Sequence, residues 1–190
     1  MEMKEITKEQ LEAIMPNAKK AGRIDKYLPY LNEKAEEYHI DTQLRWAHFI
    51  AQIAHESGEL LYTHELGKKA YFDKYETGKL GKMLGNTQKG DGWKFKGRGF
   101  IQLTGRANYA QYQKETGITA LETPEMLEEP EWCVDVSMWY WEKHGLNELA
   151  DSNSFLTITR RINGGTNGLA DRKLFLMRAR TALKIKNMKI

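Results

Sequence analysis

Residues 42–58 constrain the fold of this 190-residue chain more than any other segment. Apolar side chains recur there at helical spacing, namely Trp46, Phe49, Ile50, Ile53 and Ala54. Such a stripe predicts an amphipathic helix whose apolar face is buried. Asp41 or Thr42 can cap the beginning of this helix, and Gly58 can end it. The sequence therefore predicts a protein whose core is built round this helix.

Most of the remaining chain also carries helical patterns. The predicted helices lie within residues 1–23, 24–38, 107–116, 131–144, 154–162 and 169–185. Thr7 and Gln10 form a capping-box pattern at the start of the N-terminal helix. Pro29 is tolerated in the second helix if that helix begins near it. We expect a mainly α fold.

Residues 67–99 interrupt this pattern. Eight of the sixteen glycines lie in this range, with no clear periodicity between them. A long irregular segment in a compact domain usually serves function. We expect a small Gly-rich lobe or flap, which could contain a short hairpin, inserted in the helical core. Residues 1–190 otherwise read as a single domain, with no separate wall-binding module.

Charge and cysteine content exclude several classes of protein. The 29 basic and 26 acidic residues leave a net charge of +3, too small for nucleic-acid binding but suited to an anionic polymer such as a cell wall. Cys133 is the only cysteine, so no intramolecular disulfide can form, and its apolar neighbours predict a buried thiol rather than a nucleophile. No signal-peptide pattern or transmembrane-length apolar run is present, so we expect a cytoplasmic chain without membrane insertion.

Two glutamates flank the predicted end of the central helix. Glu56 falls in its last turn, and Glu65 follows nine residues later, beyond a glycine turn. Partial burial and the negative end of the helix dipole disfavour the ionised form of Glu56, as a general acid requires. Cleavage of a glycosidic bond needs such an acid together with a second carboxylate that activates water. From spacing alone, two ordinary surface glutamates are the simpler interpretation.

A second block, residues 96–109, alternates glycine with basic residues and then supplies neutral polar side chains. Gln102 and Thr104 fall on one side of the chain if it is extended, and Asn108 and Tyr109 follow. These amides and hydroxyls suit sugar hydroxyls and a positioned water. The alternative is a Gly-rich turn into a helix capped by Thr104. A third block, residues 162–165, reads Ile-Asn-Gly-Gly; it either connects two helices or also presents the Asn163 amide to a cleft.

These blocks resemble, in this order, glycoside hydrolase family 19. The resemblance is carried by His55-Glu56-Ser57, by residues 97–104 (Gly-Arg-Gly-Phe-Ile-Gln-Leu-Thr) and by residues 162–165, and it spans residues 24–183. It is closer to the bacteriophage endolysins of the family than to its plant chitinases. It implies a lysozyme-like helical fold with a cleft. It also implies inverting hydrolysis of β-1,4 bonds between N-acetylated sugars, without cofactor or metal.

The resemblance also implies roles for individual residues. It assigns Glu56 as the general acid and Glu65 as the general base, with Thr104 positioning the attacking water. Inversion then predicts carboxyl groups roughly 6.5–9.5 Å apart. The implied substrate contacts are Gln102, Asn108 and Asn163. We also expect His55, beside Glu56, and Tyr109, in the polar run after Thr104, to contact the substrate. Arg172 corresponds to an arginine that supports the carboxylates in chitinases.

The substrate implied by the endolysin branch is bacterial peptidoglycan, cleaved by a monomer that leaves the host cytoplasm through a holin and causes lysis. A chitinase acting on poly-N-acetylglucosamine is the alternative within the family. A lytic transglycosylase would need Glu56 alone and would yield a 1,6-anhydro sugar. A non-catalytic wall-binding module would bind walls without releasing sugars.

Two further points stay open in the sequence. His48, His55 and His64 could build a metal enzyme, although their spacing is weak for ligands and His-Glu-x-x-His is absent. Tyr62, Tyr71, Phe72 and Trp93 could stack on sugar rings, but local packing is the more ordinary role for such aromatic residues.

Overall fold

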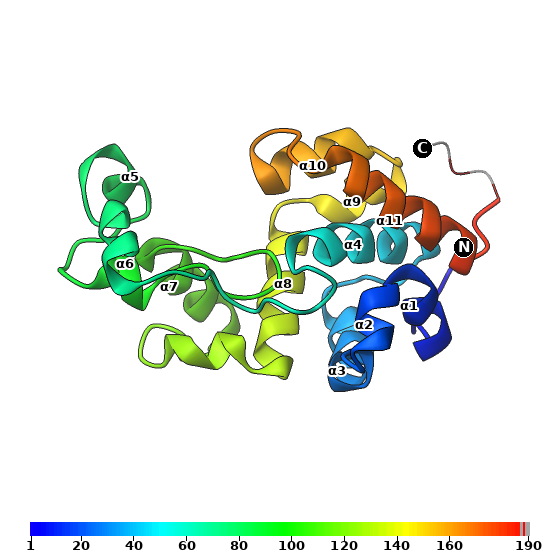
Figure 1. The fold of residues 1–190 in the computed structure, drawn as a ribbon, viewed down its shortest axis with the longest axis horizontal. Coiled ribbons are helices and arrows are strands. Elements are labelled where there is room, and N and C mark those ends of the chain that lie inside the picture. Colours follow the sequence, from blue (N-terminus) through cyan, green and yellow to red (C-terminus); the bar gives the residue numbers. More distant parts are fainter. Residues whose placement is uncertain (187, 189–190) are drawn as a thin grey trace. The chain divides into compact units, whose positions relative to one another are not determined.

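The computed structural model describes residues 1–186 and 188, and within them the chain is mainly helical (Figure 1). This confirms the predicted mainly α fold. Only isolated β-bridges, such as His64–Arg98 and Arg98–Leu103, occur in the described ranges. In chain order the elements are α1 (Lys8–Ile14), α2 (Pro16–Lys20), α3 (Ile24–Glu37), α4 (Gln43–Glu56), η1 (Lys69–Tyr75), α5 (Gly78–Met83), α6 (Asp91–Lys94), α7 (Arg106–Thr116), η2 (Pro124–Glu128), α8 (Pro130–Lys143), α9 (Leu146–Asp151), α10 (Phe155–Asn163) and α11 (Leu169–Ala182).

The chain divides into two compact units. Unit 1 comprises residues 1–62 and 138–190, and unit 2 comprises residues 63–137. The chain passes from unit 2 back to unit 1 within α8, between Ser137 and Met138.

In unit 1, α4 lies at the centre of the core and packs against α11 and α9. The Thr42 hydroxyl caps it by accepting a 3.2 Å hydrogen bond from the backbone N–H of Arg45. Every residue from 46 to 54 is buried, so the helix is enclosed on all sides and not only along the predicted stripe. Its two buried polar side chains have partners: His48 Nε2 lies 2.9 Å from Asn153 Oδ1, and Gln52 Nε2 donates to Thr159 Oγ1 at 3.0 Å.

The N-terminal helices are joined to the end of α4 by a buried carboxylate. Glu59 is only 5% exposed and accepts hydrogen bonds from the backbone N–H groups of Asn17 (2.7 Å) and Ala18 (3.1 Å). These N–H groups belong to the first turn of α2, where a negative charge is favourable. The capping box of Thr7 and Gln10 is present at α1, as predicted.

Most predicted helices are confirmed, with differences at their ends. Pro29 lies in the second turn of α3, which begins five residues before it, so the helix does not start near the proline as expected. Proline there removes one hydrogen bond and the rest of the helix is retained. The last helix, α11, ends at Ala182, three residues earlier than predicted. The short elements α9 and η2 were not predicted.

In unit 2, residues 67–99 contain η1, α5 and α6, and no hairpin. The segment folds on itself through close backbone contacts. A Cβ atom at Gly92 would lie 2.1 Å from the carbonyl oxygen of Phe72, so only glycine lets α6 pack against η1 here. Phe72 is fully buried and contacts the rings of Tyr71, Tyr75 and Trp93. Phe72 therefore packs the unit and is not available to stack on a sugar.

Candidate active site

Glu56, the last residue of α4, is held by a buried guanidinium. Arg172 of α11 is fully buried and donates to Glu56 Oε1 from Nη2. Its Nη1 donates to Gln52 Oε1 at 2.6 Å, and its Nε donates to the carbonyl oxygen of Asn167 at 3.1 Å. Three separate acceptors thus fix the orientation of the guanidinium that faces Glu56.

This arrangement is costly for a purely structural feature. Burying a charged group carries a desolvation penalty that a hydrophobic pair of similar volume would avoid. The Glu56 side chain is 19% exposed, whereas that of Arg172 is 1% exposed, so the carboxylate is the part of the pair that solvent reaches. Buried charges arranged in this way cluster at functional sites.

His55, next to Glu56, is oriented by a second charged contact. Its Nδ1 lies 2.7 Å from Oδ2 of Asp171, in the first turn of α11. The ring covers the backbone of Gly168, where an added Cβ would lie 2.1 Å from Cε1 of the imidazole. Gly168 also has a φ of +69°, so both its conformation and the ring above it require glycine.

Tyr140 and Asn163 complete this group in unit 1. Burial and the negative charge of Glu56 raise the pKa of Tyr140, so its hydroxyl stays protonated beside the carboxylate. Asn163 ends α10 and is partly exposed. Its Oδ1 accepts a 3.3 Å hydrogen bond from the backbone N–H of Asn167, so the turn after α10 restrains the predicted sugar-binding amide.

Glu65 lies in unit 2, on the loop before η1, and its contacts are of a different kind. The Tyr75 hydroxyl donates to Glu65 Oε1 at 2.8 Å, and the Glu65 backbone N–H donates to the Gly97 carbonyl oxygen at 2.8 Å. Burial and the Glu65 charge raise the pKa of Tyr75, which keeps the phenol protonated as a donor. Glu65 is partly exposed.

Gly97 also brings Gln102 and Thr104 together. A Cβ atom on Gly97 would lie 2.5 Å from Gln102 Oε1 and 3.2 Å from Thr104 Oγ1, so both side chains cover the same face of this residue. Thr104 Oγ1 donates to the Gln102 carbonyl oxygen at 2.9 Å, and Asn108 Nδ2 donates to the Thr104 carbonyl oxygen at 2.6 Å. Within unit 2, Glu65, Gln102 and Thr104 are therefore joined through one glycine.

Tyr109 does not fit its predicted role as a substrate contact. It is fully buried, and its hydroxyl donates to the Lys96 carbonyl oxygen at 2.7 Å while accepting from Arg98 Nη1 at 3.1 Å. The side chain faces the interior of unit 2 because α7 turns this position inward. Tyr109 supports the loop of residues 96–104 from below.

Unit 2, which carries Glu65, also contains a set of charged side chains formed by His64, Lys96, Arg98 and Glu128. Arg98 is 2% exposed, and its Nε donates to Glu128 Oε1 at 2.8 Å. His64 Nδ1 lies 3.0 Å from Glu128 Oε2 without the alignment of a hydrogen bond, and burial lowers the pKa of this histidine. Burial also lowers the pKa of Lys96, whose ammonium group lies 4.5 Å from the centre of the Trp93 ring.

Several of these residues were missed in the sequence. Gln52 precedes Glu56 by one helical turn, and a polar residue in an apolar stripe was the available signal. Tyr75 and Tyr140 gave no signal, because nothing in their spacing relates them to a glutamate. The fully buried Cys133 matches its prediction. The histidines of the metal alternative have separate partners, and no group of three metal-ligating side chains occurs within residues 1–186 and 188.

The chain is similar in sequence to a family 19 glycosyl hydrolase and to plant endochitinases. No protein-family model matches the chain. A "Glycosyl hydrolase family 19 domain-containing protein" of Haemophilus influenzae is 35% identical over 156 residues, covering 69% of this chain and 76% of that protein. An endochitinase of Arabidopsis thaliana is 33% identical over 120 residues, covering 63% of this chain, which spans only 39% of the plant protein.

Solved structures share the fold. Chitinase C from Streptomyces griseus superposes with a TM-score of 0.77 at 22% identity, covering 97% of this chain and 79% of that one. A class IV chitinase from Zea mays gives a TM-score of 0.58 at 19% identity, covering 97% of this chain and 86% of the maize chain.

Proposed function

The chain belongs to glycosyl hydrolase family 19, and from that premise we propose that this glycoside hydrolase cleaves β-1,4 bonds in the glycan strands of bacterial peptidoglycan. The proposal assigns Glu56 as the general acid and Glu65 as the general base of an inverting reaction. It assigns Thr104 to hold the attacking water.

The observation that carries this proposal is the contact between Arg172 and Glu56. A fully buried arginine, fastened by Gln52 and Asn167, faces one solvent-accessible carboxylate at the end of a buried helix. Proton donation requires a carboxyl group whose position relative to the glycosidic oxygen is fixed. The Tyr140 hydroxyl donates to the Arg161 carbonyl oxygen at 3.4 Å, and burial together with the Glu56 charge raises its pKa.

The surroundings of Glu65 suit the second role. A base must be held in place while one oxygen stays available to a water molecule. The Tyr75 hydroxyl occupies Oε1 of Glu65, and Gly97 connects the loop to Thr104. We assign His55, Gln102, Asn108 and Asn163 to the sugar hydroxyls and acetamido groups, and omit the buried Tyr109.

Peptidoglycan is favoured over chitin because the ordered blocks of residues 55–57, 97–104 and 162–165 resemble the bacteriophage endolysins of the family more than its plant chitinases. Chitin is the second candidate, supported by the plant endochitinase that is 33% identical over 120 residues. A lytic transglycosylase would use Glu56 without Glu65.

Mass spectrometry of a purified peptidoglycan digest tests the proposal. Hydrolysis adds water and leaves free reducing ends, whereas a transglycosylase leaves 1,6-anhydro sugars. Proton NMR of the first products should show the α-anomer if the bond is inverted. A parallel digest of colloidal chitin measures the competing activity. Anhydro products, or rapid release from chitin alone, would overturn the assignment.

We also propose that the protein acts as a phage-type endolysin, a monomer that reaches the wall from the cytoplasm through a holin. The resemblance of its ordered blocks to phage members of the family supports this role. Expression in a bacterial cytoplasm should give lysis only when a holin is co-expressed. Lysis with the Glu56→Gln variant and holin would show that the holin alone kills.

A further inference from the structure

The outer face of α11 differs from that of an ordinary surface helix. Its inner face packs Phe175, Leu176 and Ala179 into the core of unit 1, so its outer face is expected to be polar. Instead, Leu174 and Met177 are 43% and 50% exposed. The outer face of α11 therefore combines two exposed apolar side chains with charged ones such as Lys173 and Arg180.

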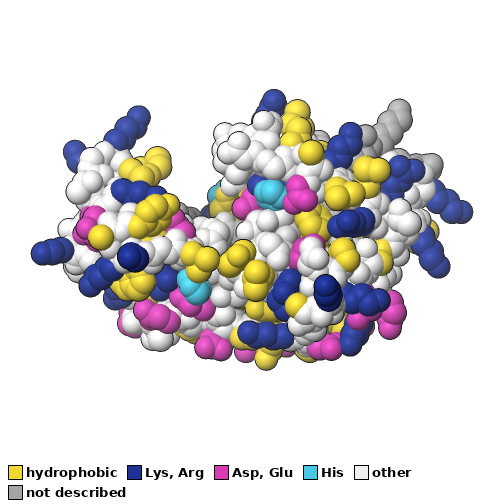
Figure 2. Space-filling model, viewed as in Figure 1, with side chains coloured by type: hydrophobic (Ala, Val, Ile, Leu, Met, Phe, Trp, Pro, Cys, Tyr) yellow, Lys and Arg dark blue, Asp and Glu magenta, His cyan; other side chains and the backbone are white. Residues whose placement is uncertain are grey.

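The same end of the chain carries the excess positive charge of the protein. Residues 173–190 contain six lysines or arginines and no aspartate or glutamate, and the other residues comprise 23 basic and 26 acidic side chains. None of the five described cations in this range forms an ion pair with residues 1–186 or 188. They are Lys173, Arg178, Arg180, Lys184 and Lys186. Figure 2 shows Lys and Arg side chains beside apolar ones over α11.

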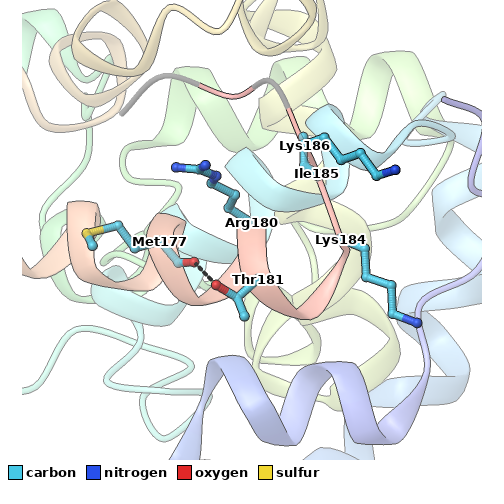
Figure 3. Close-up of a pocket in the computed structure, with 6 residues that line it drawn as sticks. All are labelled: Met177, Arg180, Thr181, Lys184, Ile185 and Lys186. Carbon is cyan, nitrogen blue, oxygen red and sulfur yellow. Dashed lines mark hydrogen bonds between the residues drawn. The ribbon is translucent and has the colours of Figure 1, made fainter.

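Two adjoining hollows lie on this face, and they differ in the side chains that line them. One, of about 380 Å³, lies at the end of α11 and carries Arg180, Lys184 and Lys186 at its rim (Figure 3). The other, of about 340 Å³, lies between α11 and α1 and is lined mainly by apolar groups, including Leu174. Met177 and Thr181 line both hollows, so the cationic and apolar surfaces are continuous.

We propose that this face binds the surface of an anionic phospholipid bilayer. The cationic hollow matches headgroup phosphates, and the neighbouring apolar hollow with Leu174 and Met177 matches the glycerol and upper acyl region beneath them. The protein would lie on the membrane and not span it, since no helix among residues 1–186 and 188 is long and apolar enough to cross.

The apolar component is what favours a lipid surface over a soluble polyanion. A phosphate polymer would satisfy Arg180, Lys184 and Lys186 but would leave Leu174 and Met177 in water. Charge alone would also make binding almost wholly dependent on salt, whereas buried apolar area resists screening.

Co-sedimentation with vesicles tests this proposal. The full chain should bind equimolar phosphatidylglycerol–phosphatidylcholine vesicles and should bind pure phosphatidylcholine vesicles far less. Arg180→Gln/Lys184→Gln/Lys186→Gln should weaken binding on the order of 100-fold, since each cation near an anionic surface contributes about fivefold. Leu174→Gln/Met177→Gln should weaken it about tenfold and remove the binding that persists at high salt.

A matched control removes the same charge elsewhere. Lys79→Gln/Lys82→Gln/Lys89→Gln takes three exposed cations from unit 2 and should bind anionic vesicles like the wild type. Equal loss in the control would show a net-charge effect and overturn the proposal. Equal binding to neutral vesicles would also overturn it, as would inorganic polyphosphate competing fully while Leu174→Gln/Met177→Gln binds normally. Hydrolysis of purified peptidoglycan should be unchanged in every variant, so this test is independent of the proposed catalytic activity.

Discussion

Glu56 and Glu65 are held in opposite ways by the two units. Unit 1 holds Glu56 at the end of an enclosed helix and faces it with a buried cation that has two other acceptors. Unit 2 holds Glu65 on a loop through one neutral phenol and the backbone of a glycine. The first arrangement joins the carboxylate to the core, whereas the second joins it to a glycine-rich segment. Changes around Glu56 should therefore affect both stability and activity, and changes around Glu65 mainly activity.

The largest expected effect is on turnover. Glu56→Gln and Glu65→Gln should each reduce peptidoglycan hydrolysis by about 10²–10⁴-fold, the usual contribution of a general acid or base. Only Glu56→Gln should also lower stability, by about 1–2 kcal/mol, because Arg172 keeps an acceptor but loses its counter-charge. Dye release from labelled walls and thermal melts measure the two effects.

Glu33→Gln, at an exposed position of α3, is the control and should change neither quantity. Full activity in Glu65→Gln would contradict the assignment of Glu65 as the general base. It would instead support a transglycosylase that uses Glu56 alone.

The next effect is on stability in unit 1. Arg172→Met should reduce the free energy of unfolding by about 3–5 kcal/mol, because removing one member of a buried pair leaves Glu56 and Gln52 without their partner. The double variant Arg172→Met/Glu56→Gln should lose less than the sum of the single losses. Urea unfolding of the wild type, the two single variants and the double variant measures the coupling free energy between Arg172 and Glu56. Additive losses would mean that the guanidinium stabilises α4 independently of Glu56.

Acid should destabilise unit 1 through the same helix. Burial lowers the pKa of His48 on α4 from 6.5 to about 4. Between pH 6.5 and about 4, His48 is therefore protonated in the unfolded chain and neutral in the folded chain. Stability is full above pH 6.5 and falls as the pH drops towards 4, by about 3 kcal/mol from this residue. His48→Gln should lose correspondingly less between pH 7 and pH 4 in urea titrations. Equal acid sensitivity would exclude His48 as the cause.

The smallest effect is expected in unit 2. Tyr75→Phe removes one hydrogen bond to Glu65 and should lower kcat about fivefold, consistent with about 1 kcal/mol for such a bond. KM and the melting temperature should change little, since the ring packing of Tyr75 is retained. Tyr30→Phe on α3 is the matched control. A fall in stability without a fall in kcat would make Tyr75 a structural residue.

Local signals in the sequence predicted much of the fold. Thr42 and Gly58 marked the two ends of α4 correctly, because caps act within a few residues. Gln102 and Thr104 both lie against Gly97, but the extended chain assumed for this prediction is absent, because Gln102 lies in a turn with a φ of +63°.

Other features depend on distant parts of the chain. The hydrogen bond between Gln52 and Arg172 joins residues 120 positions apart, so no spacing rule reveals it. Tyr109 looked like a substrate contact because its sequence neighbours are polar, whereas burial is decided by which face of α7 meets the core. The short helices α5 and α6 escaped notice because segments of this length are stabilised by packing and not by propensity.

The buried carboxylate of Glu59 has a consequence for where this enzyme can be cut. The family resemblance begins near residue 24, yet Glu59 takes its hydrogen bonds from Asn17 and Ala18. A fragment that begins at residue 24 would lack both donors. The buried carboxylate of Glu59, three residues after Glu56, would then lose these hydrogen bonds. Residues 1–23 therefore belong to the folded unit that carries Glu56, in agreement with the 97% of the chain that shares the fold of chitinase C.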